Sequence, residues 1–565
     1  MLAVGIDLGT TNSLIAVIEG DSPKLIPNSL GHTLTPSTVG LDEEGRVLVG
    51  EEARHRLVTH PELTAARFKR YMGTEHVFDL GGQKYRAEEL SALVLKSLKD
   101  DAEKYLGQAI TDVVVSVPAY FDDNQRKATI AAAEIAGLKV SRLINEPTAA
   151  AIAHGVHNKT DESTFIVLDL GGGTFDVSIL EMFDGVMEVR SSAGDAFLGG
   201  EDFTDALARD FAIQAGYEWN DLSPRRMADI YELAERAKIQ LGSEHDVTVV
   251  LSVDGERKEL KVDRESFEEI CAPILLKLRR PIERAMYDTS LKVDEIDKLI
   301  LVGGATRMSA MRSLASKLFR RLPEKDIDPD TVVALGAAVQ AGLNQKHKAL
   351  EDVVMTDICP FTLGIETATR SGKNIEDGLF SPIIERNTVV PVSKVETYHT
   401  MEDKQKAILL KVFQGEAPKV IDNVFLGQIE VPVPKNSAGE EVVDVRFTYD
   451  PSGILEVGIT VKSTGKETVF IIEKTPGKMS DAEIASKIKA LESLKKHPRE
   501  DAVNRTLLAR LGKAYEMTLG EDRGYIGELL KKFELCLTRQ DAAEISRVHG
   551  EITRVLDRIE EQYVF

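Results

Sequence analysis

Two short segments combine residue types that can hold a phosphate group. Residues 6–13 read Ile-Asp-Leu-Gly-Thr-Thr-Asn-Ser, and residues 168–176 read Leu-Asp-Leu-Gly-Gly-Gly-Thr-Phe-Asp. In both, an aspartate ends an apolar run, a glycine-rich turn follows, and a second apolar run begins. Glycines let backbone amides approach phosphate oxygens, threonine hydroxyls add donors, and a carboxylate can hold Mg²⁺ through water. The repeat therefore predicts two hairpins that grip a polyphosphate from both sides.

A third glycine turn, Leu-Val-Gly-Gly-Ala-Thr-Arg at residues 301–307, also follows an apolar run. The chain has neither the G-x-x-x-x-G-K-[ST] pattern of a P-loop nor the G-x-G-x-x-G pattern of a dinucleotide-binding fold. The alternative to phosphate binding is that these are unrelated tight hairpins, which need glycine only for their backbone geometry. The shared Asp-Leu-Gly core argues against it.

The elements that must position these turns alternate between two types up to about residue 350. Short apolar runs at residues 113–117, 165–168 and 299–302 predict strands, whereas residues 122–136 and 224–241 have a helical pattern. This alternation predicts an α/β region.

Residues 359–475 differ, because short β-rich runs follow one another without helices. Such runs occupy residues 407–413, 442–449, 454–461 and 467–472, and Asp450-Pro451-Ser452-Gly453 has the composition of a tight turn. The pattern predicts a β-sandwich.

Residues 480–565 have a helical pattern. Residues 480–483 have the composition of a capping box, and apolar residues such as Ile526, Phe533 and Val548 recur at helical spacing. This predicts the core of a small bundle, with a partner-binding helix as the alternative.

At the first junction, between the α/β region and the β-rich region, lies the short apolar segment 351–357. It is either a buried connecting strand, which the pattern favours, or a linker that docks and undocks.

Length and charge limit the class of protein. The 565 residues suggest about three or four domains, and 70 basic against 92 acidic residues give a net charge of −22. Such a charge excludes a generally basic nucleic-acid binder. Three cysteines without a C-x-x-C motif favour the reducing cytoplasm. We expect no signal peptide and no membrane span, because the N-terminus lacks a basic region and no long apolar stretch occurs.

At this point the sequence resembles the DnaK-type chaperones, the 70-kDa heat-shock protein family. The matching motifs follow the family's order over about residues 3–477, and the short overall length is most similar to the bacterial HscC-type branch. These motifs are residues 6–13, 35–37, 117–121, 144–151, 169–176, 198–203, 301–308 and 363–367.

The resemblance implies a multidomain protein. Its expected parts are an actin-like, two-lobed α/β ATPase domain (1–350), a linker (351–358), an all-β sandwich that binds peptides (359–476) and a short α-helical lid (477–565). The implied function is that of an ATP-dependent molecular chaperone, which binds extended apolar segments of unfolded proteins and changes its affinity for them by hydrolysing ATP.

The resemblance also implies catalytic roles. Asp7 and Asp169 would hold Mg²⁺ mainly through water, Lys69 would reach the γ-phosphate, Glu146 would orient the attacking water, and Thr174 would align water and phosphate. From pattern alone, Lys69 is one of many surface lysines and Glu146 is a helix N-terminal charge. The implied cofactors are ATP or ADP and Mg²⁺, with K⁺ as an optional second cation.

Further residues match the family's nucleotide-binding segments. For Glu235 and Lys238, an ordinary helical charge pair would also explain the pattern. The full set is Gly9, Thr10, Thr11, Asn12, Gly171, Gly172, Gly173, Thr174, Gly199, Gly200, Glu235, Lys238, Gly242, Gly303, Gly304, Arg307 and Asp330.

Two more sets rest on the resemblance. The residues expected at the peptide groove and its arch are Ile365, Ala368, Tyr398, Met401, Ile408, Leu410, Phe470 and Ile472, with ordinary sandwich core as the alternative. Those expected at the interdomain and J-domain surface are Arg142, Val353, Val354, Met355 and Asp357. The implied partners are unfolded client polypeptides and a J-domain co-chaperone, without nucleic acid or membrane.

The chain departs from the DnaK pattern at several positions. The arch residues Ala368 and Met401 are reversed, Thr356 replaces a leucine in the linker, and Gly242 replaces a serine at the adenosine site. Residues 73–85 and 243–262 are shorter than in DnaK, and the lid is truncated. The need for a nucleotide-exchange factor is therefore left open, because that factor usually engages the second of these segments.

Two functions from other classes compete with the chaperone. A small-molecule kinase could share the two-lobed fold, but a strand-then-helix extension of roughly 200 residues argues against it. A nucleotide-gated scaffold or filament former is the other alternative.

Overall fold

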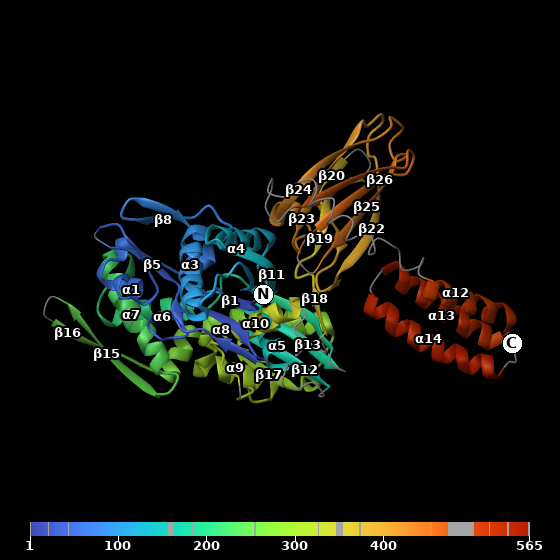
Figure 1. The fold of residues 1–565 in the computed structure, drawn as a ribbon. Coiled ribbons are helices and arrows are strands. Elements are labelled where there is room, and N and C mark those ends of the chain that lie inside the picture. The colour runs from blue at the N-terminus through green and yellow to red at the C-terminus, as the bar shows by residue number, and fades with distance from the viewer. Residues whose placement is uncertain are drawn as a thin grey trace. The chain divides into compact units, whose positions relative to one another are not determined.

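The computed structural model describes most of the chain (Figure 1). The residues outside the description are 1, 21, 43, 156–161, 184–185, 254–255, 326, 346–353, 372–373, 451–452, 454, 473–501, 519, 540–541 and 563–565. The described chain forms two compact units, Met1–Thr356 and Asp357–Phe565. The division falls inside the predicted connecting segment 351–358.

The first sheet of unit 1 contains the first Asp-Gly turn. Its strand order is β11-β10-β1-β2-β3, in which β10 and β11 are parallel to β1, while β2 and β3 continue antiparallel. Most of its side chains on β1, β2 and β10 are buried, as expected for a sheet covered on both faces. The strands are β1 (Val4–Asp7), β2 (Asn12–Glu19), β3 (Ser22–Leu25), β10 (Asp112–Val117) and β11 (Lys139–Asn145).

The second sheet has a similar arrangement around the second turn. Within unit 1 its order is β17-β12-β13-β14, followed by Val354–Thr356, which pair in parallel with β14. Strand β17 is parallel to β12, and β13 is antiparallel to both β12 and β14. The strands are β12 (Ser163–Leu170), β13 (Phe175–Phe183), β14 (Val186–Asp195) and β17 (Lys298–Val302). In both sheets an Asp-Gly turn therefore joins two antiparallel strands, and the first of these strands also has a parallel neighbour.

Helices cover both sheets. The predicted helix at 122–136 is α4, which Asp122 caps by accepting a hydrogen bond from the amide of Gln125 at 2.9 Å. The long helices of unit 1 are α3 (Ala87–Leu106), α4 (Asp123–Ile135), α5 (Glu146–Gly155), α6 (Gly200–Gln214), α7 (Pro224–Gln240), α8 (Arg264–Thr289), α9 (Ser309–Phe319) and α10 (Val332–Asn344).

Smaller elements complete unit 1. A three-stranded sheet has the order β6-β5-β7, and two hairpins are formed by β8 with β9 and by β15 with β16. These elements are β4 (Thr35–Pro36), β5 (Thr38–Leu41), β6 (Val47–Val49), β7 (Thr64–Ala66), β8 (Val77–Leu80), β9 (Gln83–Arg86), β15 (Asp246–Val253), β16 (Glu256–Asp263), the short helices α1 (Glu51–Arg54) and α2 (Arg56–Thr59), and the 3₁₀ turns η1 (Pro61–Leu63), η2 (Phe68–Tyr71), η3 (Trp219–Asp221), η4 (Val293–Glu295) and η5 (Gly304–Arg307).

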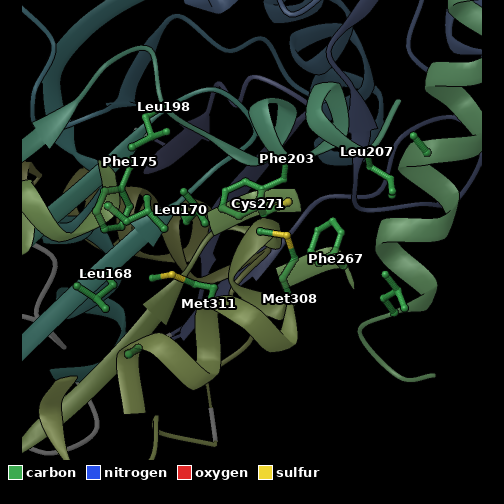
Figure 2. Packing of buried hydrophobic residues seen from close by; sticks show 14 of the residues in the cluster. Leu168, Leu170, Phe175, Leu198, Phe203, Leu207, Phe267, Cys271, Met308 and Met311 are labelled. Carbon is green, nitrogen blue, oxygen red and sulfur yellow. The ribbon is translucent and has the colours of Figure 1, made fainter. Parts of the chain in front are cut away.

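Each large sheet of unit 1 has its own hydrophobic core. Figure 2 shows part of the second, where Leu170 and Phe175 pack with residues of the covering helices. The rings of Phe203 on α6 and Phe267 on α8 lie 6.4 Å apart in this core, close to Cys271. Burial of this apolar surface holds the helices against the sheet and so fixes the ends of β12 and β13.

Unit 2 begins with two four-stranded antiparallel sheets, ordered β20-β19-β23-β24 and β22-β25-β26-β27. Their inner faces form one core, and Gly453 donates a hydrogen bond to the carbonyl of Asp450 at 2.9 Å, as expected for the predicted turn. The strands are β18 (Val354–Ile358), β19 (Leu363–Ser371), β20 (Asn374–Ile384), β21 (Val389–Val390), β22 (Val392–His399), β23 (Ala407–Gln414), β24 (Val424–Pro432), β25 (Val442–Tyr449), β26 (Leu455–Val461) and β27 (Lys466–Ile472), with the 3₁₀ turn η7 (Val420–Asp422).

The last helices among the described residues are α12 (Ala502–Met517), α13 (Gly520–Arg539) and α14 (Ala542–Gln562). Ile526, Phe533 and Val548 are buried in their shared core, so the prediction of a small bundle is confirmed. The predicted capping box at 480–483 lies outside the described residues. Among the described helices, none is both long and apolar enough to cross a membrane.

Candidate functional site

The first Asp-Gly turn joins β1 to β2 and is held by two serines. The Ser37 hydroxyl donates to the carbonyl of Gly9 at 2.7 Å, and the Gly9 amide donates to the Ser13 hydroxyl at 3.2 Å. The two hydroxyls lie 2.8 Å apart in a buried position. This small network fixes the backbone of the turn, so its amides are already oriented before any ligand arrives.

The second turn joins β12 to β13 and supports the start of α6. Asp169 and Asp176 are directly opposite each other in the hairpin, and the Gly171 amide donates to the carbonyl of Thr174 at 3.1 Å. The amides of Gly200 and Glu201 donate to the carbonyls of Gly171 and Gly172, both at 2.8 Å. The turn and the first residues of α6 therefore form one connected structure.

The two turns lie against each other. A Cβ atom built on Gly172 would lie 2.1 Å from the Thr11 Oγ1 atom, and one built on Gly173 would lie 3.0 Å from the Thr10 Cγ2 atom. The first distance is shorter than real Cβ contacts, and the second would require the neighbouring side chain to shift by a few tenths of an ångström. A side chain on either glycine would therefore push against the threonines of the first turn.

Both turns line one cavity of about 360 Å³. The structure also brings to this cavity the third glycine turn, Lys69, Glu146 and most of the other residues predicted to bind nucleotide. The predicted residues that line it are Asp7, Gly9, Thr10, Thr11, Asn12, Lys69, Glu146, Asp169, Gly171, Gly172, Thr174, Gly200, Glu235, Lys238, Gly242, Gly303, Gly304, Arg307 and Asp330.

Gly173 and Gly199 support the cavity without lining it. A Cβ atom on Gly199 would lie 2.4 Å from the Gly172 carbonyl oxygen and 2.5 Å from the Gly173 nitrogen. A Cβ atom on Gly173 would also meet the side chain of Arg70 at 2.7 Å. The contribution of these two glycines is close backbone packing behind the second turn.

Four acidic side chains are gathered at the turns. Burial raises the pKa of Asp7 to about 7, and the Glu146 carboxylate acts in the same direction. Burial and Glu146 likewise raise the pKa of Asp176 to about 7, and burial raises that of Asp169 well above its ordinary value. The cluster is therefore short of positive charge.

Lys69 supplies a cation to this cluster. Its side chain is 4% exposed, and its Nζ atom donates to Glu146 Oε1 at 2.7 Å. It comes from η2, whereas Glu146 begins α5. The interpretation of Lys69 as a surface lysine is therefore wrong, because the fold buries this side chain against carboxylates that are distant in the sequence.

The acids fit a hydrated Mg²⁺ ion. Among the described residues, the Oδ2 atoms of Asp169 and Asp176 are buried without a hydrogen-bond partner. Asp7 has one oxygen engaged by the Ser116 hydroxyl at 2.7 Å. In the described part of the chain, no three or more His, Cys, Asp or Glu side chains are grouped so that they could hold a metal ion. A magnesium ion at Asp7 and Asp169 would keep several of its waters, as Mg²⁺ prefers.

We expect Asp176→Asn to alter the pH dependence of stability. Because the pKa of Asp176 rises from 3.8 to about 7 on folding, its contribution to stability falls as pH rises between these values. The asparagine variant cannot ionise. In metal-free buffer, its melting temperature relative to wild type should rise by about 2 °C or more between about pH 5 and about pH 7.5. A difference that stays constant over this range would contradict the raised pKa.

The cavity is also lined by an ion pair on α7, which is formed by Lys238 and Glu235. Lys238 Nζ lies 2.7 Å from Glu235 Oε2 and donates to the Thr204 hydroxyl at 2.7 Å and the Gly200 carbonyl at 3.1 Å. Burial opposes ionisation of Glu235, but Lys238 outweighs it and lowers the pKa of this carboxyl. The helical charge pair is therefore present and also lies at the cavity.

Arg307, from the third turn, donates hydrogen bonds to two aspartates. Its Nε and Nη2 atoms donate to Asp330 Oδ2 at 3.0 and 2.7 Å, and Nη2 also donates to Asp328 Oδ1 at 2.7 Å. The planar guanidinium is therefore held in one orientation at the cavity.

Sequence reasoning missed three polar residues of this region. Arg54 and Glu201 line the cavity, and the Asp176 Oδ1 atom accepts a hydrogen bond from the amide of Tyr120 at 2.9 Å. Asp176 could have been found, because it ends the second repeated motif. No sequence signal marks Arg54, which lies on the short helix α1.

The residues predicted for a peptide groove divide into two classes. Ile365, Leu410 and Ile472 are buried in the sandwich core. Tyr398, Ile408 and Phe470 pack against that core and are partly exposed. The predicted arch residues, Ala368 on β19 and Met401 just after β22, are also partly exposed.

The described part of the connecting segment, from Val354 onward, lies in strand β18, as the sequence pattern favours. In unit 1, Val354, Met355 and Thr356 pair in parallel with Val186, Met187 and Glu188 of β14. In unit 2, Asp357 pairs with Val390. Val353 lies outside the described residues, as do the side chains of Val354 and Met355.

Arg142, predicted at the J-domain surface, lies on β11 of unit 1 opposite Val114 of β10. Its side chain is partly buried, and its Nε atom has no hydrogen-bond partner among the described residues.

Comparison with known proteins agrees with this geometry. The profile of the family described as "Hsp70 protein" matches residues 3–79 and 76–532. The "Chaperone protein DnaK" of Deinococcus proteolyticus is 42% identical to the chain over 507 residues, which cover 84% of this chain and 79% of that protein. The profile extends over both sheets with their Asp-Gly turns, the sandwich and much of the C-terminal helices, so the chain belongs to the Hsp70 protein family.

Proposed function

We propose that the cavity between the two Asp-Gly turns binds ATP with Mg²⁺ and hydrolyses its terminal phosphate. The family makes the chain an ATP-dependent chaperone that hydrolyses ATP and binds unfolded proteins. The roles of individual residues rest on one observation: residues of both turns, Lys69, Glu146, Asp7 and Asp169 line a single cavity.

Phosphoryl transfer from ATP to water requires positioning and charge compensation more than covalent chemistry. The amides of the two turns would hold the phosphate oxygens, and Lys69 would approach the terminal phosphate. Glu146, which Lys69 holds in place, would orient the attacking water, and Thr174 would align it with the phosphate. Asp7 and Asp169 would hold Mg²⁺ through water, and the ion would neutralise phosphate charge. K⁺ remains a proposed second cation.

We infer an actin-like, two-lobed fold for unit 1, because each of its two large sheets has an Asp-Gly turn between antiparallel strands and both turns line one cavity. The proposed domains are the ATPase domain (1–350), the linker (351–358), the peptide-binding sandwich (359–476) and the helical lid (477–565). Pairing of Val354–Thr356 with β14 supports a linker that can couple the two units.

The proposed location is the cytoplasm. The three cysteines are buried and none is in a disulfide, which suits a reducing compartment.

We propose that extended apolar segments of client proteins bind to the sandwich. Tyr398, Ile408 and Phe470 would contact client side chains, because they are apolar and only partly buried. The buried Ile365, Leu410 and Ile472 would shape the groove from beneath. A J-domain co-chaperone is the proposed partner at Arg142 and Asp357, and the need for an exchange factor is left open.

The test is ATP hydrolysis with and without an unfolded apolar peptide. We expect slow basal turnover that the peptide stimulates, because binding at the sandwich is coupled to the nucleotide site. Transfer of phosphate to a sugar, or pelleting of polymers with ATP but no effect of peptide, would contradict the chaperone.

A substitution in the sandwich should separate peptide binding from ATP binding. We expect Ile408→Phe to weaken peptide affinity by about tenfold or more, because added volume at a packed position blocks the groove. ATP affinity should stay unchanged. Ile421→Phe is the matched control, since Ile421 is 87% exposed on the same sandwich. Equal peptide affinity for both variants, measured by fluorescence anisotropy, would remove Ile408 from the groove.

A further inference from the structure

The segment that carries Lys69 is anchored on both sides by arginines. Arg70 Nη2 lies 3.0 Å from Asp202 Oδ2 and also donates to the carbonyl of Phe197. Arg67, just before η2, has a φ of 61°, a left-handed conformation that is unfavourable for any residue with a Cβ atom. Such a conformation persists only where the surrounding contacts hold it.

The side chain of Arg67 makes those contacts. Its guanidinium lies 4.0 Å from the centre of the Tyr231 ring, and its Nε atom lies 3.2 Å from Glu201 Oε2. Its Nη1 atom is 4.0 Å from Asp205 Oδ1. The Tyr231 hydroxyl donates to the same oxygen of Glu201, so arginine, tyrosine and glutamate form a closed group.

This group joins segments that belong to the two hydrophobic cores of unit 1, since Phe68 lies in the first core and Phe203 and Ala234 lie in the second. Arg67 follows β7 and precedes Lys69, whereas Glu201 and Asp205 belong to α6 and Tyr231 to α7. The amide of Glu201 is bonded to the carbonyl of Gly172 in the second turn. The group therefore connects the segment of Lys69 to the turn that would hold phosphate.

The group also lies beside a second cavity, of about 500 Å³. Arg67 and Tyr231 line this second cavity, which shares Thr10, Thr11, Arg54, Glu201 and Glu235 with the first one. The two cavities are thus neighbours, and the group stands where they meet. Separating the segments that the group joins would open the first cavity towards the second.

We propose that Arg67 is a positioning residue that holds the nucleotide cavity closed and slows the release of ADP. The proposal rests on the nucleotide site proposed above. The side chain does not touch the Lys69–Glu146 pair, so its loss should change how long nucleotide stays bound more than it changes hydrolysis. An arginine suits this role, since it can stack on a ring and pair with carboxylates at once.

The test measures the release of a fluorescent ADP analogue by stopped flow. We expect Arg67→Ala to release it about tenfold faster, the effect of losing a partly buried arginine contact with a ring and an acid. Single-turnover hydrolysis of ATP that is already bound should stay within about twofold of wild type. Release that stays at the wild-type rate would overturn the proposal, as would slower hydrolysis without faster release.

Three further variants test how Arg67 acts. Arg67→Gly separates the effect of the side chain from that of the backbone, because it relieves the left-handed strain yet lacks the side chain. Its release rate should match that of Arg67→Ala. Arg67→Lys retains the charge without the planar stacking and should be intermediate. If Arg67→Ala does not fold, Tyr231→Phe decides, because it loses only the hydroxyl bonded to Glu201; an unchanged release rate would then overturn the proposal.

A matched control lies outside unit 1. Arg523 stacks on Tyr515 at 4.6 Å among the C-terminal helices, and Arg523→Ala should release the analogue at the wild-type rate. Faster release from this control would show that the effect is not specific to Arg67 and would overturn the proposal. Equilibrium titration of the wild type with ADP separates failure of the proposed function from failure of this inference. If the wild type does not bind nucleotide, the proposed function itself is refuted. If it binds nucleotide but Arg67→Ala releases it at the wild-type rate, only this inference is refuted.

Discussion

Lys69→Ala should lower the rate of ATP hydrolysis by about 10²–10³-fold, the loss seen when one preorganised group that stabilises transition-state charge is removed. Lys69 is buried and is bonded to Glu146, and its charge also acts on Asp7, Asp169 and Asp176. Without it, the developing charge on the phosphate and the Glu146 carboxylate would both lack their cation. The measurement is single-turnover hydrolysis at saturating Mg²⁺.

Nucleotide binding should largely survive this substitution, because the backbone amides of both turns remain in place. We expect the Kd for ADP to change by less than about tenfold, a single charge contact among many. Lys139→Ala is the matched control, since the Lys139 side chain is 81% exposed and its contact with Asp112 spans 3.9 Å. Hydrolysis at the wild-type rate in Lys69→Ala would remove Lys69 from the catalytic residues.

Gly199→Ala should abolish tight nucleotide binding, although Gly199 does not line the cavity. The added Cβ atom would lie 2.4 Å from the Gly172 carbonyl oxygen and 2.5 Å from the Gly173 nitrogen, so the second turn must move. Two or more charge-assisted hydrogen bonds from this turn to phosphate would then be lost. We expect ADP affinity to fall by about 100-fold or more, measured by calorimetry.

The backbone conformation of Gly199 makes this test specific. Its φ of −162° is extended and open to any residue, so only the collision with the second turn is expected to matter. Gly524→Ala is the matched control, because nothing lies within 4 Å of a Cβ atom at Gly524 on α13. Circular dichroism should show that both variants fold. Unchanged ADP affinity in a folded Gly199→Ala variant would contradict the assignment of the second turn to phosphate.

The strands and helices of this protein were largely predictable because they depend on local patterns. The predicted strand at 442–449 is β25 (Val442–Tyr449), and the predicted helix at 224–241 is α7 (Pro224–Gln240). Alternation of apolar residues and helix caps acts over a few residues, so it can be read without the fold. The repeated Asp-Gly turns are of the same kind, since glycine and aspartate are required within one hairpin.

The sequence by itself thus determined that two similar turns exist and which elements hold them. Only the tertiary structure decided that Lys69 is buried against Glu146, and that Arg67 reaches Glu201 and Tyr231. Each of these contacts joins side chains far apart in the chain. Their pKa values and charge compensation depend on burial and on distances in space, and no short stretch of sequence encodes either.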